Sequence, residues 1–168
     1  MSIIVKFIVI TPLNSTWIRN SAEQQIKDTY KTPESLQQAE NTLLPAFTDE
    51  SLIWGQNDFS KEMLMAFNEE EPVSSLRLVS NQPKLQELEA NKPMYLDMIV
   101  HNFSEEGLKA LINRAEQIAH QRKYDLLWTS VSVEDTFIKD TFEAFGFKKI
   151  ENQPDTNTNS SIVFAKQV

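Results

Sequence analysis

The chain has 168 residues, 24 acidic against 16 basic side chains, and no cysteine. Its length fits one globular domain over residues 1–168, and its 40% hydrophobic content excludes a disordered chain. The lack of cysteine excludes disulfides, thiolate metal sites and thiol catalysis, and with two histidines we expect no metal centre. The net charge of −8 argues against nucleic acid or an anionic membrane as a partner, because like charges repel.

The first predicted element is a buried strand at residues 3–10, which is rich in isoleucine and valine and ends before Pro12. This run is much shorter than the roughly 20 residues that cross a bilayer. Lys6 interrupts it, no basic segment precedes it, and no cleavage site of small residues follows it. These features predict a cytoplasmic protein without a membrane segment.

Two helices are predicted after this strand. The first begins at Asn14 or Ser15, since either side chain can cap it. Its apolar residues recur every four positions: Ile18, Ala22, Ile26 and Tyr30. The second begins at Thr32, with Pro33 at the first helical position. The pattern leaves open whether residues 51–54 form a helical turn or a loop.

A hairpin is predicted next, with strands at residues 62–67 and 73–79 around an acidic turn. The polar residues 81–92 are predicted to be a loop, and residues 94–101 a strand. Ser104 then caps the helix with the clearest periodicity, whose apolar residues are Leu108, Leu111, Ile112, Ala115, Ile118 and Ala119.

The strand predicted at residues 126–133 completes a strand–helix–strand unit with residues 94–101, and such units form parallel crossovers. A helix at 136–145 and two strands at 147–151 and 161–166 follow, with the polar loop 152–160 between the strands. This order predicts the α/β class. We expect a single domain with a mixed, mostly antiparallel sheet, a central parallel strand pair and flanking helices.

Three stretches resemble the GNAT-type N-acetyltransferases. EMLMAFNEEEPVSSLRLV is similar to the second and third strands of that family, and MYLDMIVH with GLKALINRAEQIAHQRKYDLLWTSV to its strand–helix–strand core. DTFIKDTFEAFGFKKIE is similar to its closing helix and strand. The resemblance covers the whole chain in element order and residues 62–151 in motif detail. It implies a GNAT-like fold and an N-acyltransferase that uses acetyl-coenzyme A.

In the family, the coenzyme pyrophosphate lies at the start of the central helix, where backbone N–H groups attract phosphate. The matching residues 101–108 keep one glycine, so the resemblance implies Gly107 and Leu108 as coenzyme-binding residues. Glu105 and Glu106 fall in the first helical turn, where they would repel a phosphate or simply stabilise the helix. The resemblance also implies Asp135 beside the pantetheine arm, at a position that is asparagine in the family.

A further difference is Phe142, which replaces the tyrosine that often protonates the leaving thiolate in the family. Along the strand at 94–101, the backbone of Met98, Ile99 and Val100 is predicted to pair with the pantetheine arm, as an added strand would.

Simple alternation along the strand 94–101 predicts that Tyr95, Asp97, Ile99 and His101 share one face. Asp97 is the candidate general base for deprotonating an amine, and its alternative role is an ion pair with a lysine or arginine. His101 is expected to be an exposed loop residue, and its alternative role is that of a base.

Residues 1–72 hold 11 acidic and 5 basic residues, a net charge of −6, which predicts a cationic acceptor amine, either a small molecule or a protein amine. The function predicted is therefore acyl-coenzyme-A-dependent transfer of an acetyl group to an amine. A non-catalytic GNAT-fold binding module that has lost the pyrophosphate site is the alternative. A third alternative is a protein that assembles with a copy of itself, as a homodimer, through an exposed edge strand.

Overall fold

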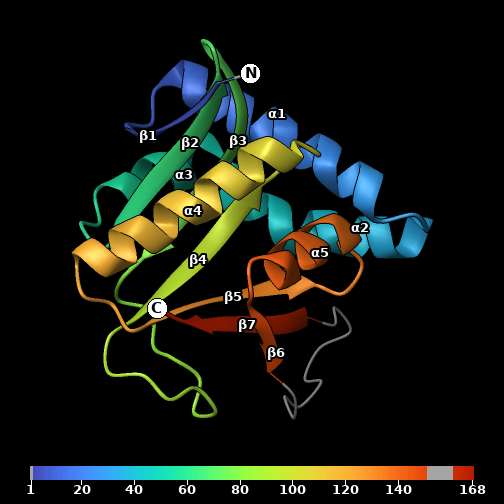
Figure 1. Ribbon diagram of the computed structural model, residues 1–168. Helices are drawn as coiled ribbons and strands as arrows, with labels where there is room; N and C mark the ends of the chain where they lie inside the picture. The colour runs from blue at the N-terminus through green and yellow to red at the C-terminus, as the bar shows by residue number, and fades with distance from the viewer. Residues whose placement is uncertain (1, 151–160) are drawn as a thin grey trace.

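The computed structural model describes residues 2–150 and 161–168. Seven strands in these ranges form one sheet in the order β1-β2-β3-β4-β5-β7-β6 (Figure 1). The strands are β1 Ile3–Ile8, β2 Lys61–Asn68, β3 Glu71–Val79, β4 Pro93–Val100, β5 Leu126–Ser132, β6 Lys148–Ile150 and β7 Ser161–Gln167. Among the strand pairs of the described residues, β4–β5 is parallel and the others are antiparallel. The predicted mixed sheet with its central parallel pair is confirmed.

The helices cover both faces of this sheet. They are α1 Pro12–Thr29, α2 Pro33–Leu43, the short 3₁₀ turn η1 Leu44–Phe47, α3 Asp49–Gln56, α4 Glu105–Gln121 and α5 Thr136–Ala144. In Figure 1, α4 and α5 lie in front of the sheet, and α1 to α3 lie behind it. The largest apolar core lies beneath α4 and α5, and a second one lies beneath α1 and α3. No helix in the described ranges is both long and apolar enough to span a bilayer.

Helix α1 begins earlier than its predicted cap. Its N-cap is Thr11, whose hydroxyl accepts the N–H of Asn14, and Pro12 takes the first helical position. Proline fits this position because its fixed φ is already helical and its missing N–H would have no partner. The same threonine–proline signal starts α2 at Thr32, as predicted. Residues 51–54, which the pattern left open, belong to α3.

The parallel pairing of β4 and β5 is short. It joins residues 93–96 to residues 126–129, and beyond these residues neither strand pairs with the other. At the point of separation, the Thr129 hydroxyl donates to the Leu96 carbonyl at 2.8 Å. The end of the chain adds β7, which pairs with β5 and β6. Strand β6 ends at Ile150, and the loop predicted at 152–160 lies outside the described residues.

Candidate functional site

A β-bulge in β4 determines the shape of the site. Between the cross-strand pairs Arg77–Asp97 and Ser75–Val100, the register advances two residues along β3 but three along β4. The extra residue is Met98, whose φ of 49° lies in the left-handed region. A bulge bends its strand and increases the local twist. Strand β4 therefore turns away from β5 after Leu96.

The bulge also reverses which side chains share a face. Met94 and Leu96 belong to the core beneath α4, and after the bulge Ile99 packs against that same core. Val100 instead belongs to the core beneath α1. The prediction that Tyr95, Asp97 and Ile99 share one face is therefore wrong, because one inserted residue shifts the two-residue alternation by one position.

A cavity of about 410 Å³ lies where the two strands separate. Residues 97–100 of β4 and residues 129–132 of β5 line it, and helix α1 and the segment from α2 to η1 cover it. Asp135 lines it too, in the turn that follows β5. The cavity thus brings together five residues that the sequence suggested for the site: Asp97, Met98, Ile99, Val100 and Asp135.

Asp97 forms an ion pair with Arg77, its cross-strand neighbour on β3. The guanidinium donates from Nε to Oδ1 at 2.8 Å and from Nη2 to Oδ2 at 2.7 Å. Both side chains are about one-fifth exposed, at 19% for Arg77 and 22% for Asp97. The ion pair that the sequence left open as an alternative is therefore present, and the role of general base stays a prediction.

His101 is buried at 0% exposure, so the expectation of an exposed loop residue is wrong. Its Nδ1 accepts the N–H of Phe103 at 3.0 Å and therefore carries no proton. The proton of the neutral ring is then on Nε2, which lies 2.9 Å from Oδ2 of Asp135 and donates to it. The other carboxylate oxygen of Asp135 accepts the N–H of Ile138 and caps α5.

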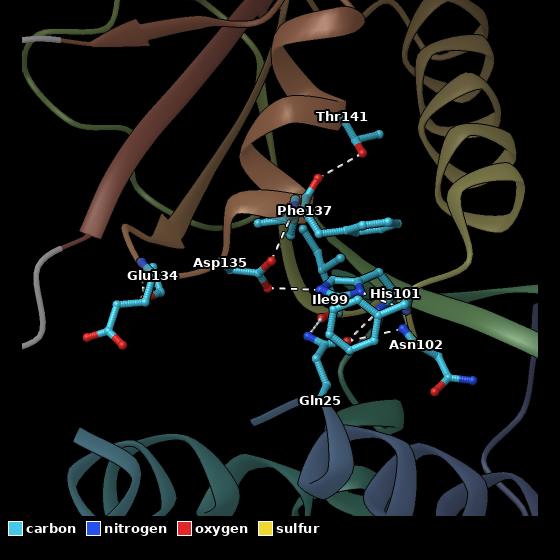
Figure 2. A network of polar contacts seen from close by, with 11 residues as sticks. Gln25, Ile99, His101, Asn102, Glu134, Asp135, Phe137 and Thr141 are labelled. Carbon is cyan, nitrogen blue, oxygen red and sulfur yellow. Dashed lines mark hydrogen bonds and ion pairs between the residues drawn. The ribbon is translucent and has the colours of Figure 1, made fainter. Parts of the chain in front are cut away.

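Gln25 of α1 reaches the end of β4 from the side opposite α5 (Figure 2). Its amide nitrogen donates to the carbonyl of Ile99 at 3.1 Å. Its amide oxygen accepts two successive backbone N–H groups, from His101 at 2.7 Å and from Asn102 at 3.2 Å. One side chain from α1 thus satisfies three backbone groups at the end of β4.

Several solved structures have the same architecture over nearly their full length. The PaiA N-acetyltransferase of Thermoplasma acidophilum, solved in complex with coenzyme A, matches with a TM-score of 0.72 at 16% identity, covering 100% of each chain. An N-acetyltransferase of Staphylococcus aureus Mu50 has a TM-score of 0.66 at 14% identity, covering 99% of this chain and 98% of that one. The N-acyl amino acid synthase FeeM, from uncultured soil microbes, has a TM-score of 0.64 at 15% identity, covering 99% and 91%.

No protein-family model and no curated protein matches the sequence. The structural matches nevertheless extend over essentially the full chain, and they are N-acyl-transferring enzymes of one architecture. The chain has the GNAT-type N-acetyltransferase fold.

Within this GNAT fold, the glycine of the central helix has a packing role. A Cβ at Gly107 would lie 2.6 Å from the Ser74 hydroxyl of β3, so only glycine lets α4 lie this close to the sheet. The N–H of Gly107 donates to the hydroxyl of Ser104, and that of Leu108 to the Ser104 carbonyl. Leu108 itself is fully buried in the core. Coenzyme binding by Gly107 and Leu108 stays a prediction that these contacts do not support.

Two tyrosines of the GNAT cavity were not assigned to the site from the sequence. Tyr30, at the end of α1, and Tyr95 of β4 both line it. Burial raises the pKa of Tyr30, and burial raises the pKa of Tyr95 to about 12, so both phenols stay protonated at neutral pH. Phe142, in contrast, is fully buried, with its ring centroid 4.8 Å from that of Phe147. In the described residues, no group of three or more His, Asp or Glu side chains could hold a metal ion.

Proposed function

We propose that the chain transfers an acyl group, expected to be acetyl, from the thioester of coenzyme A to a primary amine. One observation carries the proposal: the bulge at Met98 separates β4 from β5, and the separated ends line a cavity. From Met98 to Val100, β4 no longer pairs with β5, and its Ile99 carbonyl there accepts the amide of Gln25. The amide-bearing pantetheine arm would bind along this edge as an added strand. A structural neighbour solved with coenzyme A and another that makes N-acyl amino acids support a thioester donor and an amine acceptor.

The thioester supplies an activated acyl group. The amine nitrogen bonds to the acyl carbon, the carbon–sulfur bond breaks, the sulfur leaves as a thiolate, and the ammonium proton passes to a base or to water. The protein contributes by holding the reactants together and by directing backbone N–H groups of β4 at the thioester carbonyl. Because a thiolate is a good leaving group, the transfer does not require a proton donor at Phe142.

Asp97 is the proposed base for that proton, and Arg77 fixes its orientation beside the bulge. Both carboxylate oxygens accept hydrogen bonds from the guanidinium, so Asp97 takes a proton only when one of these bonds is given up. Replacing Asp97 with asparagine should lower kcat by about 100-fold. An Asp97→Asn protein that loses stability but keeps its kcat would contradict the role of base.

The acceptor is proposed to be cationic: a polyamine, an aminoglycoside-like amine, or a lysine or N-terminal amine of a protein. Residues 1–72 carry a net charge of −6 and supply α1, α2 and η1, which cover the cavity. A negative field near a site raises the local concentration of cations.

A panel of such amines, each incubated with acetyl-coenzyme A, tests the function. We expect free thiol to appear with time and the mass of one acceptor to increase by one acetyl group. Incubation without an amine controls for hydrolysis of the thioester. Thiol release without an acetylated product, or acetylation of anionic acceptors only, would contradict the proposal.

A non-catalytic binding module is the second candidate, because the N–H groups of residues 101–103 and of Gly107, around the start of α4, already have partners within the chain. Such a module would bind amines in the cavity without acetyl-coenzyme A. Calorimetric titration with amines and with acetyl-coenzyme A, each alone, separates the two candidates.

A further inference from the structure

Side chains of the protein bridge the opening between the separated ends of β4 and β5 (Figure 2). His101 follows β4 and donates to Asp135, which precedes α5. The imidazole also packs on Phe137 of α5, with 4.5 Å between the ring centroids. His101 is 0% and Asp135 9% exposed. Asp135 lines the cavity, whereas His101 does not, and Gln25, which accepts the N–H groups of His101 and Asn102, lines it as well.

The backbone N–H groups of residues 101–103 lie in the turn just before α4, and N–H groups near a helix start are of the kind that binds a diphosphate. The side chain of Gln25 accepts those of His101 and Asn102, and the imidazole of His101 accepts that of Phe103. The first two residues of α4, Glu105 and Glu106, are exposed acids that repel phosphate. These residues therefore do not fit the diphosphate of coenzyme A. The edge of β4 at Met98, which has no cross-strand partner on β3 or β5, is still open to the amide-bearing arm.

We propose that the chain recognises its thioester donor through the pantetheine arm alone. Gln25 and His101 occupy the backbone N–H groups that would otherwise bind the nucleotide end, so that end adds nothing to the affinity. The inference rests on the proposed function and narrows it: the donor class is a thioester of pantetheine, with or without a nucleotide. Gln25 is the specificity-determining residue, because its amide oxygen occupies the position between two N–H groups where a phosphate oxygen would bind.

Calorimetric titration of the full chain with pantetheine and with coenzyme A, at matched low salt, tests the inference without relying on activity. We expect the two Kd values to agree within about threefold. Coenzyme A binding at least about tenfold more tightly than pantetheine would overturn the inference and leave the proposed function standing. If neither ligand binds, both are wrong. Equal binding without acyl transfer to any amine supports the inference and overturns the function alone.

A variant pair locates the cause. Gln25→Ala frees the N–H groups of His101 and Asn102. It is made together with Glu105→Gln and Glu106→Gln, so that no acid opposes tighter binding of the diphosphate. We expect the ratio of the pantetheine Kd to the coenzyme A Kd to rise about tenfold, the effect of new charge-assisted hydrogen bonds. Gln24→Ala in the same background is the control, since Gln24 is exposed on α1 and contacts Asp28. An unchanged ratio of Kd values in a Gln25→Ala protein with a normal thermal melt would overturn the inference. If the variant does not fold, the titrations of the unmodified chain with pantetheine and coenzyme A decide it.

Discussion

Asp125, just before β5, fixes the long loop 81–92 with its carboxylate. Its Oδ2 accepts the N–H of Asn91 at 2.7 Å, and its Oδ1 accepts that of Lys92 at 2.9 Å. Behind these bonds, Leu88 of the loop packs against the sheet in a small core with Trp128. The hydrogen bonds, that from Asn91 above all, lower the pKa of Asp125. The position of the loop therefore depends on an ionised carboxylate.

Acid should loosen this loop. A carboxyl group whose folded pKa lies below its unfolded value stabilises the fold above the unfolded pKa, and this contribution disappears as the pH falls through the folded pKa. The free energy of unfolding should therefore decrease below about pH 4, and more steeply than in Asp125→Asn, which has no carboxylate to protonate. Urea unfolding of both proteins at about pH 7 and about pH 3 measures this difference. The same pH dependence in both proteins would contradict it.

At the scale of single residues, the sequence showed which groups carry chemistry but not how they pair. Asp97 and Asp135 were both found from the strand and the motif, and both line the cavity. The partners of the buried end of β4 could not be predicted, because His101 meets Asp135 across 34 residues and Gln25 across 76. Helical spacing places Gln25, seven residues after Ile18, on the apolar face of α1 and Gln24 on the exposed side, but it does not show which backbone groups Gln25 binds.

At the scale of elements, periodicity predicted nearly every helix and strand but missed the bulge in β4. A bulge is often marked by glycine, which adopts a positive φ without strain. Here Met98 takes that conformation, so the sequence gives no sign of it. The cross-strand ion pair of Arg77 and Asp97 lies directly before the bulge and holds the register up to it. The geometry of the site thus depends on an irregularity that alternation cannot reveal.

Substitutions at Met98 should reveal the backbone strain of its positive φ. Leucine and isoleucine have similar volumes, but only isoleucine is branched at Cβ, which the left-handed region accommodates poorly. We expect Met98→Ile to be less stable than Met98→Leu by about 1 kcal/mol, as measured by chemical unfolding. The leucine variant controls for the loss of the thioether. Equal stabilities would mean that β4 can form without the bulge.

At the scale of the whole molecule, charge is distributed unevenly over the fold. Residues 1–72 carry a net charge of −6, whereas residues 73–168, with 13 acidic and 11 basic residues, carry −2. The first part includes the helices behind the sheet that cover the cavity. The predicted fold was confirmed at this scale, because the order of elements and the parallel crossover leave few ways to assemble a sheet.

This asymmetry predicts that the KM for a cationic acceptor increases with ionic strength. Screening weakens attraction beyond about 10 Å at 0.1 M salt, so the effect comes from the field of residues 1–72 as a whole rather than from contacts in the cavity. Initial rates at several salt concentrations measure it, with an uncharged amine as the control. A salt-independent KM for the cationic acceptor would mean that the negative charge of residues 1–72 does not contribute to its binding.

The position of β7 affects how the chain folds during synthesis. Strand β7 lies between β5 and β6, both of which precede it in the chain, and it supplies the cross-strand partners of β6. Until residues 161–167 have been made, one edge of β5 stays unpaired and β6 has no neighbour in the sheet. A nascent chain that has already completed β1 to β5 must therefore keep an open strand edge, the kind of surface that invites mispairing with another chain.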